Sequence, residues 1–573
     1  MKISIAHATR RPALALEIRK LWLSAAKHPD KIEWIFAIDS DDASSLSLLT
    51  HERHVVCEPG GGSTFAYNAA AKETIGEIII AVADDTHPFP YWDTAITGRL
   101  VADRPQVLLT GDGYRLDRLA TLPIITRAWY QRYGFLFPPQ FKTMGPDLWL
   151  TERASRDSCL VYAEDLVFEH RHAFYKKAEM DEVYRRQNDP TLFAHANAVI
   201  KELLEPLPIS LCLMVGNEAE IIERLLNSAA DAFDQLCLVR AIGNQLPDQT
   251  IARAEAWCQA KSKKFRFAEY ENKIDFPHVD DFSAALNLAF SLATSYWCLR
   301  LDADDLIDEL NCRRVRETAS NTRFECFRFP YLLENGGMIY RERLIKRGRG
   351  LWQDAIHETC KINGATCIVP QVEIKHAPVS GHEATSVARN LALLQIASPV
   401  HPRARFYLHE EFLRAGRRKE AEATGLALAE ELNGNMPAEH YEVLLNLAEL
   451  QPEKTEHWCF EALRLDPGRR EALSQLIQFA LDCGDVPRAA HLFRWMDTIP
   501  EPNPKPWTHR PIWYPVRPST PNSQPSTLNN GWARNWLKIK ILRAAGQTAA
   551  AAAAHAEYIA DPNYAAALTS MPN

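Results

Sequence analysis

The chain has 573 residues, 46% of them hydrophobic, and a formal net charge of −8 at pH 7. This length suffices for about three or four domains with separate cores. The acidic balance provides no global attraction to nucleic acid or anionic lipid, although a local basic patch stays open. No apolar run reaches the length of a membrane span, no signal-peptide pattern is present, and the twelve cysteines occur singly, so we expect a cytoplasmic protein with reduced thiols.

The first block, residues 1–205, alternates apolar strand-like runs with amphipathic segments. Ile3–Ala6 and Trp34–Ile38 are predicted strands, and Ala13–Ala26 is the helix predicted between them. One long polar helix is predicted over Asp181–Leu204. Strands and helices that alternate at these lengths predict a mostly parallel sheet covered on both faces.

The second block, residues 206–384, begins again after Pro206-Leu207-Pro208 with the same kind of pattern. Ile209–Val215 and Gln235–Val239 are predicted strands, and Phe282–Ala293 is predicted as the helix that precedes an acidic turn. The order of features repeats that of the first block. We therefore interpret the two blocks as a tandem duplication of one fold.

From residue 385 onward the chain is predicted to be helical. Small residues and prolines at the helix turns of residues 385–498 resemble tetratricopeptide repeats, in which small side chains let paired helices approach closely. Residues 499–573 contain a Pro-rich stretch, Pro500–Pro525, which we expect to be extended, and then a terminal helical hairpin.

Paired carboxylates follow an apolar strand in both blocks. Asp84-Asp85 ends one strand, and Asp302-Ala303-Asp304-Asp305 ends the other. Oxygen ligands at the end of a buried strand suit Mg²⁺ or Mn²⁺ held against a diphosphate. Either pair taken alone is also explained as a turn or a helix cap. The repeated context, with Asn68 and Asn287 in the upstream helices, favours the metal.

These motifs resemble the family 2 glycosyltransferases, which have the GT-A fold. The resemblance covers residues 1–186 and 209–378. It implies an α/β fold with two tandem GT-A domains, followed by an all-α region of helical repeats. It also implies a nucleotide-diphosphate sugar as donor, Mn²⁺ or Mg²⁺ as cofactor, and a carboxylate that acts as the catalytic base.

In the first block the resemblance assigns roles to residues on the strands, on one helix and at the acidic turn. The catalytic base is Asp147, for which a helix-capping carboxylate is the alternative. The metal ligands are Asp84, Asp85 and a later histidine, His172, beside which His170 is also a candidate. The residues implied to bind the donor are Ala6, Thr9, Asp39, Asn68 and Asp84.

The second block resembles a subgroup that often carries helical repeats. The implied base is Glu358, in the pair His357-Glu358, and the implied metal ligands are Asp302, Asp304 and His376. The residues implied to bind the donor are Asn217, Glu218, Asn287, Asp302 and Arg343. Arg343 belongs to a basic run, 341–349, which fits either a diphosphate clamp or a solvated loop. One feature departs from the family, because the stretch 239–244 lacks the nucleoside-binding acid.

The sequence therefore predicts a metal-dependent, inverting glycosyltransferase, with one or two active sites. The acceptor stays open between a glycan, a protein and a hydroxylated DNA base, since the first block also looks somewhat like bacteriophage glycosyltransferases. The helical repeats are expected to bind a protein partner. The alternative is a tetratricopeptide-type adaptor in which one or both transferase blocks have lost catalysis and serve for binding.

Overall fold

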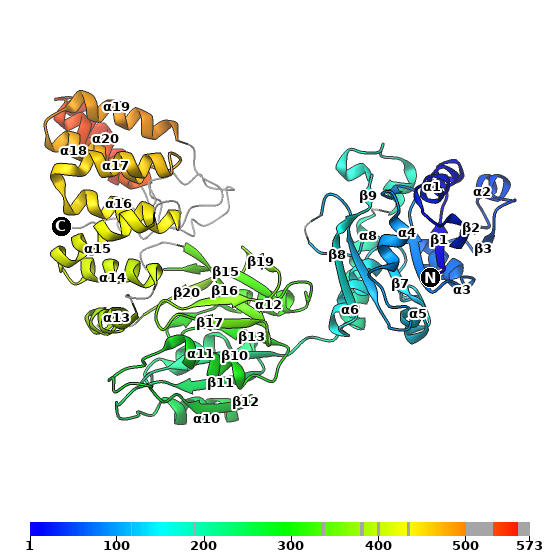
Figure 1. Cartoon of the computed structure of the whole chain (residues 1–573), viewed down its shortest axis with the longest axis horizontal. Coiled ribbons are helices and arrows are strands. Elements are labelled where there is room, and N and C mark those ends of the chain that lie inside the picture. Colours follow the sequence, from blue (N-terminus) through cyan, green and yellow to red (C-terminus); the bar gives the residue numbers. More distant parts are fainter. Residues whose placement is uncertain are drawn as a thin grey trace. The chain divides into compact units, whose positions relative to one another are not determined.

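The computed structural model describes residues 1–115, 117–187, 189–333, 338–378, 383–397, 401–432, 436–499 and 531–559 (Figure 1). The chain divides into two compact units. The first consists of Met1–Leu207 with Ala319–Phe324, and the second of Pro208–Thr318 with Glu325–Asn573. The predicted Pro-rich stretch, Pro500–Pro525, lies outside the described residues. Among the helices of the described part, none combines the length and the apolar character needed to cross a membrane.

The first unit is built on a seven-stranded mixed sheet. Its strands, in spatial order, are β3 (His54–Cys57), β2 (Ile32–Asp39), β1 (Ile3–Ala8), β4 (Ile78–Val82), β7 (Ile124–Thr126), β6 (Val107–Gly111) and β8 (Leu160–Val167). The first four are parallel, and β7 runs antiparallel to both of its neighbours. A short ladder of β5 (Thr86–His87) and β9 (Glu169–His170) lies beside the acidic turn.

Both faces of this sheet are buried, because alternate side chains of each strand enter different cores. On β2, Trp34 and Phe36 pack on one face with helices α1 (Pro12–Ala25) and α4 (Trp92–Thr97). Ile35 and Ala37 pack on the other face. The helices that contribute to that second core are α3 (Gly62–Lys72), α5 (Arg127–Tyr133), α6 (Pro146–Arg156) and α8 (Pro190–Leu203). Helix α2 (Ala43–Leu48) lies between β2 and β3 in the chain.

The long helix predicted over Asp181–Leu204 is wrong, because the structure has two helices there, α7 (Glu182–Gln187) and α8. Asp189 caps α8 by accepting a hydrogen bond from the backbone N–H of Thr191 at 2.8 Å. Pro190 occupies the first turn of α8, where the missing N–H is tolerated, but it would break a continuous helix.

The second unit contains a mixed sheet with the same central strand order. Its strands, in spatial order, are β12 (Lys264–Glu269), β11 (Gln235–Arg240), β10 (Ile209–Val215), β13 (Trp297–Arg300), β16 (Met338–Lys346), β15 (Cys326–Leu332), β20 (Ile374–His376) and β14 (Asp305–Leu306), and β19 (Thr366–Ile368) also pairs with β15. A hairpin, β17 (Gly350–Gln353) and β18 (Thr359–Ile362), lies off this sheet. The shared order supports the duplication, which stays a prediction.

Four helices accompany this second sheet. They are α9 (Ile222–Ser228), α10 (Thr250–Ala260), α11 (Phe282–Ser291) and α12 (Glu309–Ala319). The apolar side of α11, with Ala285 and Ala289, packs on Cys212, Cys237 and Cys298 of three neighbouring strands. No disulfide joins cysteines of the described residues.

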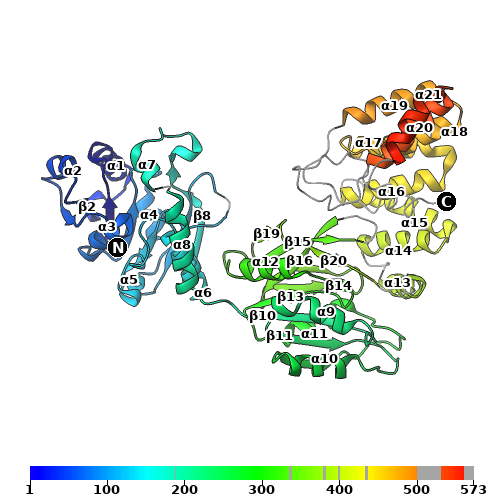
Figure 2. The same cartoon turned by 180° about the vertical axis from the view of Figure 1, so that it is seen from behind.

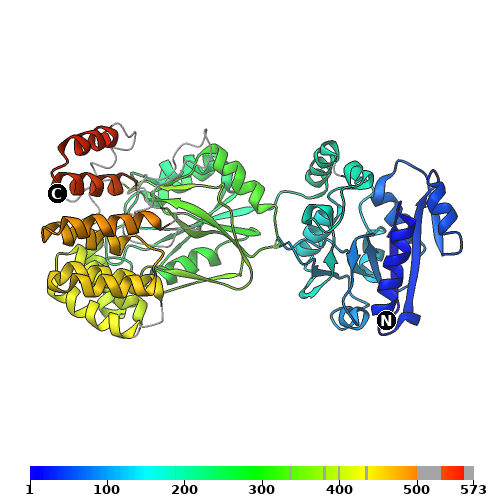
Figure 3. The ribbon, with the colours of Figure 1, turned by 90° about the horizontal axis from the view of Figure 1, so that it is seen from above.

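The C-terminal part of the second unit consists of helices that pack consecutively, as Figures 2 and 3 show in yellow to red. They are α13 (Glu383–Ala397), α14 (Pro402–Arg414), α15 (Arg418–Glu431), α16 (Pro437–Leu450), α17 (Thr455–Leu465), α18 (Glu471–Asp482), α19 (Val486–Thr498), α20 (Gly531–Ala544) and α21 (Thr548–Ile559). Small buried residues such as Ala421, Ala462 and Ala489 let the helices approach closely. The predicted fold class, α/β sheets followed by helical repeats, is confirmed.

Candidate active sites

The first unit has a cavity of about 810 Å³ beside the carboxyl ends of its parallel strands. This is the edge at which open α/β sheets bind ligands. The predicted site residues that line the cavity are Thr9, Asp39, Asp84, Asp85, Asp147, His170 and His172. Ala6 is fully buried and does not line it, and neither does Asn68. The structure therefore brings most of the predicted first site together.

Asp84 is held by strand β1. Its Oδ1 lies 2.9 Å from Nε2 of His7, and its Oδ2 accepts a hydrogen bond from the Thr9 hydroxyl at 3.1 Å. His7 is fully buried, and Asp84 is 7% exposed. Both carboxylate oxygens are thus occupied by His7 of β1 and by Thr9 just after it, so Asp84 is suited to join the acidic turn to the sheet.

Asp85 points toward groups on the other side of the cavity. Its Oδ2 accepts a hydrogen bond from the Tyr184 hydroxyl at 2.8 Å, and its Oδ1 lies 3.3 Å from Nε2 of His170. Burial alone would raise the pKa of Asp85, but the interactions with His170 and Tyr184 outweigh it and lower the pKa to about 2. Asp85 is therefore a carboxylate anion at neutral pH.

Backbone hydrogen bonds fix the geometry of the first acidic turn. The N–H of Thr86 donates to the carbonyl of Ala83 at 3.3 Å, and the N–H of Arg171 donates to the carbonyl of Asp85 at 2.8 Å. In the short β5–β9 ladder, Thr86 is paired with His170. This pairing places His170 directly across from the acidic turn.

The second acidic turn has the same hydrogen-bond pattern. The N–H of Asp305 donates to the carbonyl of Asp302 at 3.0 Å, and the N–H of Ala377 donates to the carbonyl of Asp304 at 2.9 Å. Strand pairing sets Asp305 opposite His376. The two turns therefore correspond residue by residue.

This correspondence matches Asp85 with Asp304 and His170 with His376. It departs from the sequence-based assignment of His172 as the histidine ligand of the first site, because the β5–β9 pairing brings His170 to the turn. His172 instead caps a short turn, where its Nδ1 accepts a hydrogen bond from the N–H of Phe174 at 3.2 Å. We therefore predict His170 as the histidine of the first metal site.

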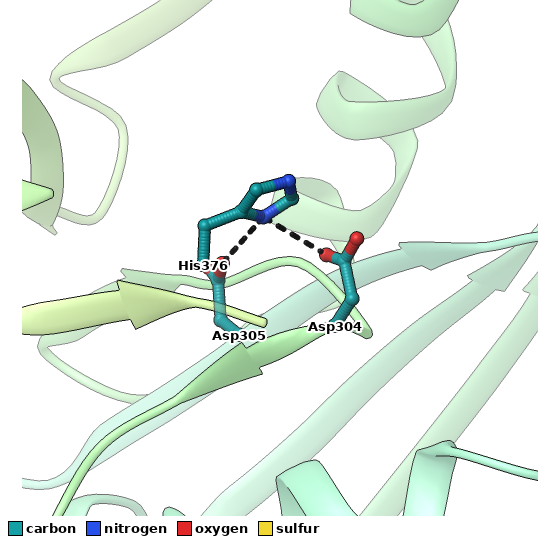
Figure 4. A group of neighbouring side chains, drawn as sticks. All are labelled: Asp304, Asp305 and His376. Carbon is teal, nitrogen blue, oxygen red and sulfur yellow. Dashed lines mark ion pairs between the residues drawn. The ribbon is translucent and has the colours of Figure 1, made fainter. Parts of the chain in front are cut away.

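In the second unit, Asp304, Asp305 and His376 form a compact group of ligand atoms (Figure 4). Their ligand atoms all lie within 4.8 Å of one another, and no other such group occurs in the described part of the chain. Nδ1 of His376 is 3.6 Å from Asp304 and 3.7 Å from Asp305, and the Tyr331 hydroxyl donates to Asp305 at 2.8 Å. Of the predicted ligands Asp302, Asp304 and His376, the last two belong to this group.

Asp302 lies outside that group and is paired with two buried arginines. Arg300 donates to its Oδ1 at 2.6 Å, and Arg343 lies 3.6 Å from its Oδ2 and 3.3 Å from Asp305. Burial would raise the pKa of Asp302, but the two positive charges outweigh it and lower the pKa. Arg343, predicted to bind the donor, is 3% exposed on β16 and stacks over Tyr331, so it stabilises the acidic turn from within.

The candidate bases lie on different kinds of element in the two units. Asp147 lies in the first turn of α6, and its Oδ1 accepts a hydrogen bond from the N–H of Leu148 at 2.9 Å. Burial raises the pKa of Asp147. Glu358 lies in the loop between β17 and β18, with Oε1 3.6 Å from Arg300. Glu358 is thus paired with a cation, whereas burial is the main influence on the pKa of Asp147.

Asn68 and Asn287 share one role that their motif did not reveal. Asn68 donates to the carbonyl of Phe137 at 2.7 Å and accepts a hydrogen bond from its N–H at 2.9 Å. Asn287 makes the same pair of hydrogen bonds with Trp352, at 2.9 and 3.0 Å. Each amide therefore fixes the chain segment that leads to a candidate base, so the structure places both residues behind the site.

We expect Asn287→Ala to lower the free energy of unfolding by about 1–3 kcal/mol, because it leaves the N–H and carbonyl of Trp352 without their partner. The measurement is chemical denaturation followed by the fluorescence of the tryptophans. Asn244→Ala is the matched control, since Asn244 bonds an exposed carboxylate, Asp275, at 3.1 Å. An equal loss in both variants would contradict this role.

The remaining donor-site predictions fall on the loops at the strand ends. Asp39 accepts a hydrogen bond from Nε of Arg10 at 2.8 Å. Asn217 donates to the carbonyl of Leu246 at 3.0 Å and so fixes the loop after β11. The backbone N–H of Glu218 donates to the Thr250 hydroxyl at 2.7 Å.

Where the second unit lacks the nucleoside-binding acid, an arginine ends the strand. Arg240 is paired with Glu269 at the end of the neighbouring strand. Both residues line a cavity of about 390 Å³, together with Gly243 and Asn244. The place expected for the nucleoside therefore has a different charge pattern in the two units.

Comparison with known proteins finds a family similarity for one segment. Residues 210–360 match the model of the family described as glycosyl transferase family 2. The prophage-derived glycosyltransferase SunS of Bacillus subtilis is 26% identical over 152 residues, which is 26% of this chain and 33% of SunS. The match thus spans about a third of the length of SunS. The assignment of the first block as a second copy stays a prediction.

Two further similarities each cover half of the chain or less. A TPR repeat-containing protein of Synechococcus elongatus is 38% identical over 97 residues, which is 17% of this chain and 20% of that protein. The crystal structure of S. aureus TarS 1-349 in complex with UDP-GlcNAc is 12% identical, covers 50% of this chain and 84% of its own, and has a TM-score of 0.26.

Proposed function

We propose that this chain, whose residues 210–360 form a family 2 glycosyltransferase domain, moves a sugar from a nucleotide-diphosphate donor to an acceptor hydroxyl. The observation that carries the proposal is the correspondence of the two acidic turns. Each sets a carboxylate, Asp85 or Asp304, next to a histidine, His170 or His376. Each unit also has a candidate base. In the first unit this base, Asp147, lines the same cavity as Asp85 and His170.

The residues at both turns fit a divalent cation. Carboxylate oxygens and imidazole are ligands for Mn²⁺, and Mg²⁺ takes oxygen ligands. In the first unit Oδ1 of Asp85 is buried and faces Nε2 of His170 at 3.3 Å, so both atoms are turned toward one point. Asp85 with His170, and Asp304 with Asp305 and His376, would hold the ion. When bound, a divalent cation neutralises charge that develops on a diphosphate leaving group.

The chain's own residues supply the proton transfer and the positioning. Asp147 accepts the proton of the acceptor hydroxyl, whose oxygen forms a bond to the anomeric carbon of the donor. The bond from that carbon to the diphosphate breaks, and the nucleoside diphosphate leaves with the electron pair. Attack on the face opposite the leaving group inverts the anomeric configuration. General-base assistance of this kind contributes about 10²–10⁴-fold.

The second site is proposed to act in the same way with Glu358, and the chain then adds two sugars in sequence. Its Arg300–Glu358 contact and the absent nucleoside-binding acid favour the alternative for this unit, namely an inactive domain that serves for binding. Metal-dependent hydrolysis of a nucleotide sugar without acceptor separates the two, because an adaptor shows none. For the acceptor we keep a glycan, a protein or a hydroxylated DNA base.

We expect nucleotide sugars with Mn²⁺ to raise the melting temperature of the full chain. A ligand at a hundred times its Kd stabilises the native state by about 2.7 kcal/mol. A panel of UDP-, GDP- and ADP-sugars identifies the donor, and the variants Asp85→Asn and Asp304→Asn assign each shift to one site. If no nucleotide sugar shifts the melting temperature with or without Mn²⁺, the proposal is refuted.

A further inference from the structure

The loop that carries Glu358, residues 354–358, lies against the first two helices of the C-terminal region. We propose that α13 and α14 hold this loop in place, so that Tyr407 and Arg403 are positioning residues for the second site. The proposal rests on the function proposed above for Glu358. It makes the helical region a part of the second active site, rather than only a surface for partners.

The closest contact is between His357, the neighbour of Glu358, and α14. The rings of His357 and Tyr407 are stacked, with centroids 3.8 Å apart and planes inclined by 18°. Arg403 donates to the His357 carbonyl at 3.5 Å and to the Tyr407 hydroxyl at 3.1 Å. Side chain and backbone of His357 are thus both held by α14.

Apolar packing anchors the middle of the same loop. Ile356 is 8% exposed and belongs to a core that includes Leu393 and Leu394 of α13 and Leu408 of α14. On the opposite side, the N–H of Phe282 at the start of α11 donates to the carbonyl of Ala355 at 2.8 Å. The loop is therefore held by contacts with its own domain and with the helical region.

A buried carboxylate adds a polar contact between the helical region and the loop. Glu411 of α14 is 1% exposed, lies 3.9 Å from Nε2 of His357, and accepts a hydrogen bond from Asn390 of α13 at 2.9 Å. This links the two helices to each other and to the loop.

The backbone of the loop needs such support. Asp354 and His357 have φ values of 72° and 53°, in the left-handed region that side chains disfavour. Conformations of this kind persist only where the surroundings hold them. Without α14 we expect the loop to relax, which moves Glu358 away from Arg300. In the first unit Asp147 sits on a helix of its own domain, so its site does not depend on the helical region.

The test compares Tyr407→Ala with Tyr407→Phe, which keeps the ring but loses the hydroxyl, in the full chain. Phe460→Ala on α17 is the matched control, because Phe460 is an exposed aromatic residue away from the loop. The first readout is hydrogen–deuterium exchange of the peptide 350–362. We expect Tyr407→Ala to exchange about 2- to 13-fold faster, the change that corresponds to a lost aromatic contact. Unchanged exchange in Tyr407→Ala overturns the proposal.

The second readout is hydrolysis of UDP-, GDP- and ADP-sugars with Mn²⁺ in chains that also carry Asp85→Asn, which silences the first site. We expect Tyr407→Ala to lower kcat with KM unchanged, and Tyr407→Phe to restore it. If Glu358→Gln lowers kcat but Tyr407→Ala does not, the positioning role is wrong. If the chain without Tyr407 substitutions shows no turnover, the function proposed for this site fails, and the exchange result alone decides whether α14 holds the loop.

Discussion

Asp85→Asn is expected to lower metal-dependent donor turnover at the first site by about 10²–10³-fold, the usual loss when one electrostatic stabiliser of the transition state is removed. The reason is its correspondence with Asp304, together with the contact to His170 at 3.3 Å. Asparagine keeps the size and the hydrogen bond from Tyr184 but removes the negative charge. The measurement is hydrolysis of the donor at a series of Mn²⁺ concentrations.

Asp84→Asn is the matched control for that variant, since it removes the same charge from the adjacent residue. Asp84 is engaged by His7 of β1 and by Thr9 just after it, so we expect a smaller loss of turnover and a lower melting temperature. Both variants are measured in a chain with Asp304→Asn, so that the second site does not contribute. A greater loss of turnover in Asp84→Asn than in Asp85→Asn would show that the two roles are exchanged.

The strands of both sheets, and the helices that alternate with them, could be predicted because their apolar side chains are buried. Apolar runs such as Ile209–Val215 are buried on both faces of a sheet, and such runs are a strong signal in sequence. The break at Pro190 was missed, although proline is unfavourable inside a helix. The acidic turns were found because paired carboxylates follow an apolar strand in both blocks, with an asparagine in each upstream helix.

The roles of the individual acids were not predictable, because they depend on partners distant in sequence. Asp302 and Asp305 are equally acidic in sequence, and Arg343 on β16 lies near both, but Arg300 pairs with Asp302. The choice of His170 over His172 depends on a two-residue ladder, too short to leave a periodic pattern. Small differences of register thus decide which residue reaches the site.

Asp147→Asn is expected to lower glycosyl transfer at the first site by about 10²–10⁴-fold, because asparagine cannot accept the proton of the acceptor. Binding of the nucleotide sugar should persist, since the variant leaves Asp85 and His170 in place. The measurement is turnover together with the thermal shift given by the donor. Asp165→Asn is the control, as Asp165 is an exposed carboxylate paired with Arg99. Loss of the thermal shift in Asp147→Asn would contradict a role as base alone.

Because the pKa of Asp147 is raised, we expect Asp147→Asn to change activity and stability in opposite directions. Turnover requires the carboxylate, so it should fall as pH decreases through a pKa above the ordinary value for aspartate, about 3.9. A raised pKa also means that the folded state holds the proton more tightly than the unfolded state does. The charged form at neutral pH therefore costs stability, and that cost appears as pH rises through the folded pKa. Asp147→Asn should keep or raise the melting temperature at pH 7 while activity is lost, which separates a catalytic carboxylate from a helix cap, whose removal lowers it.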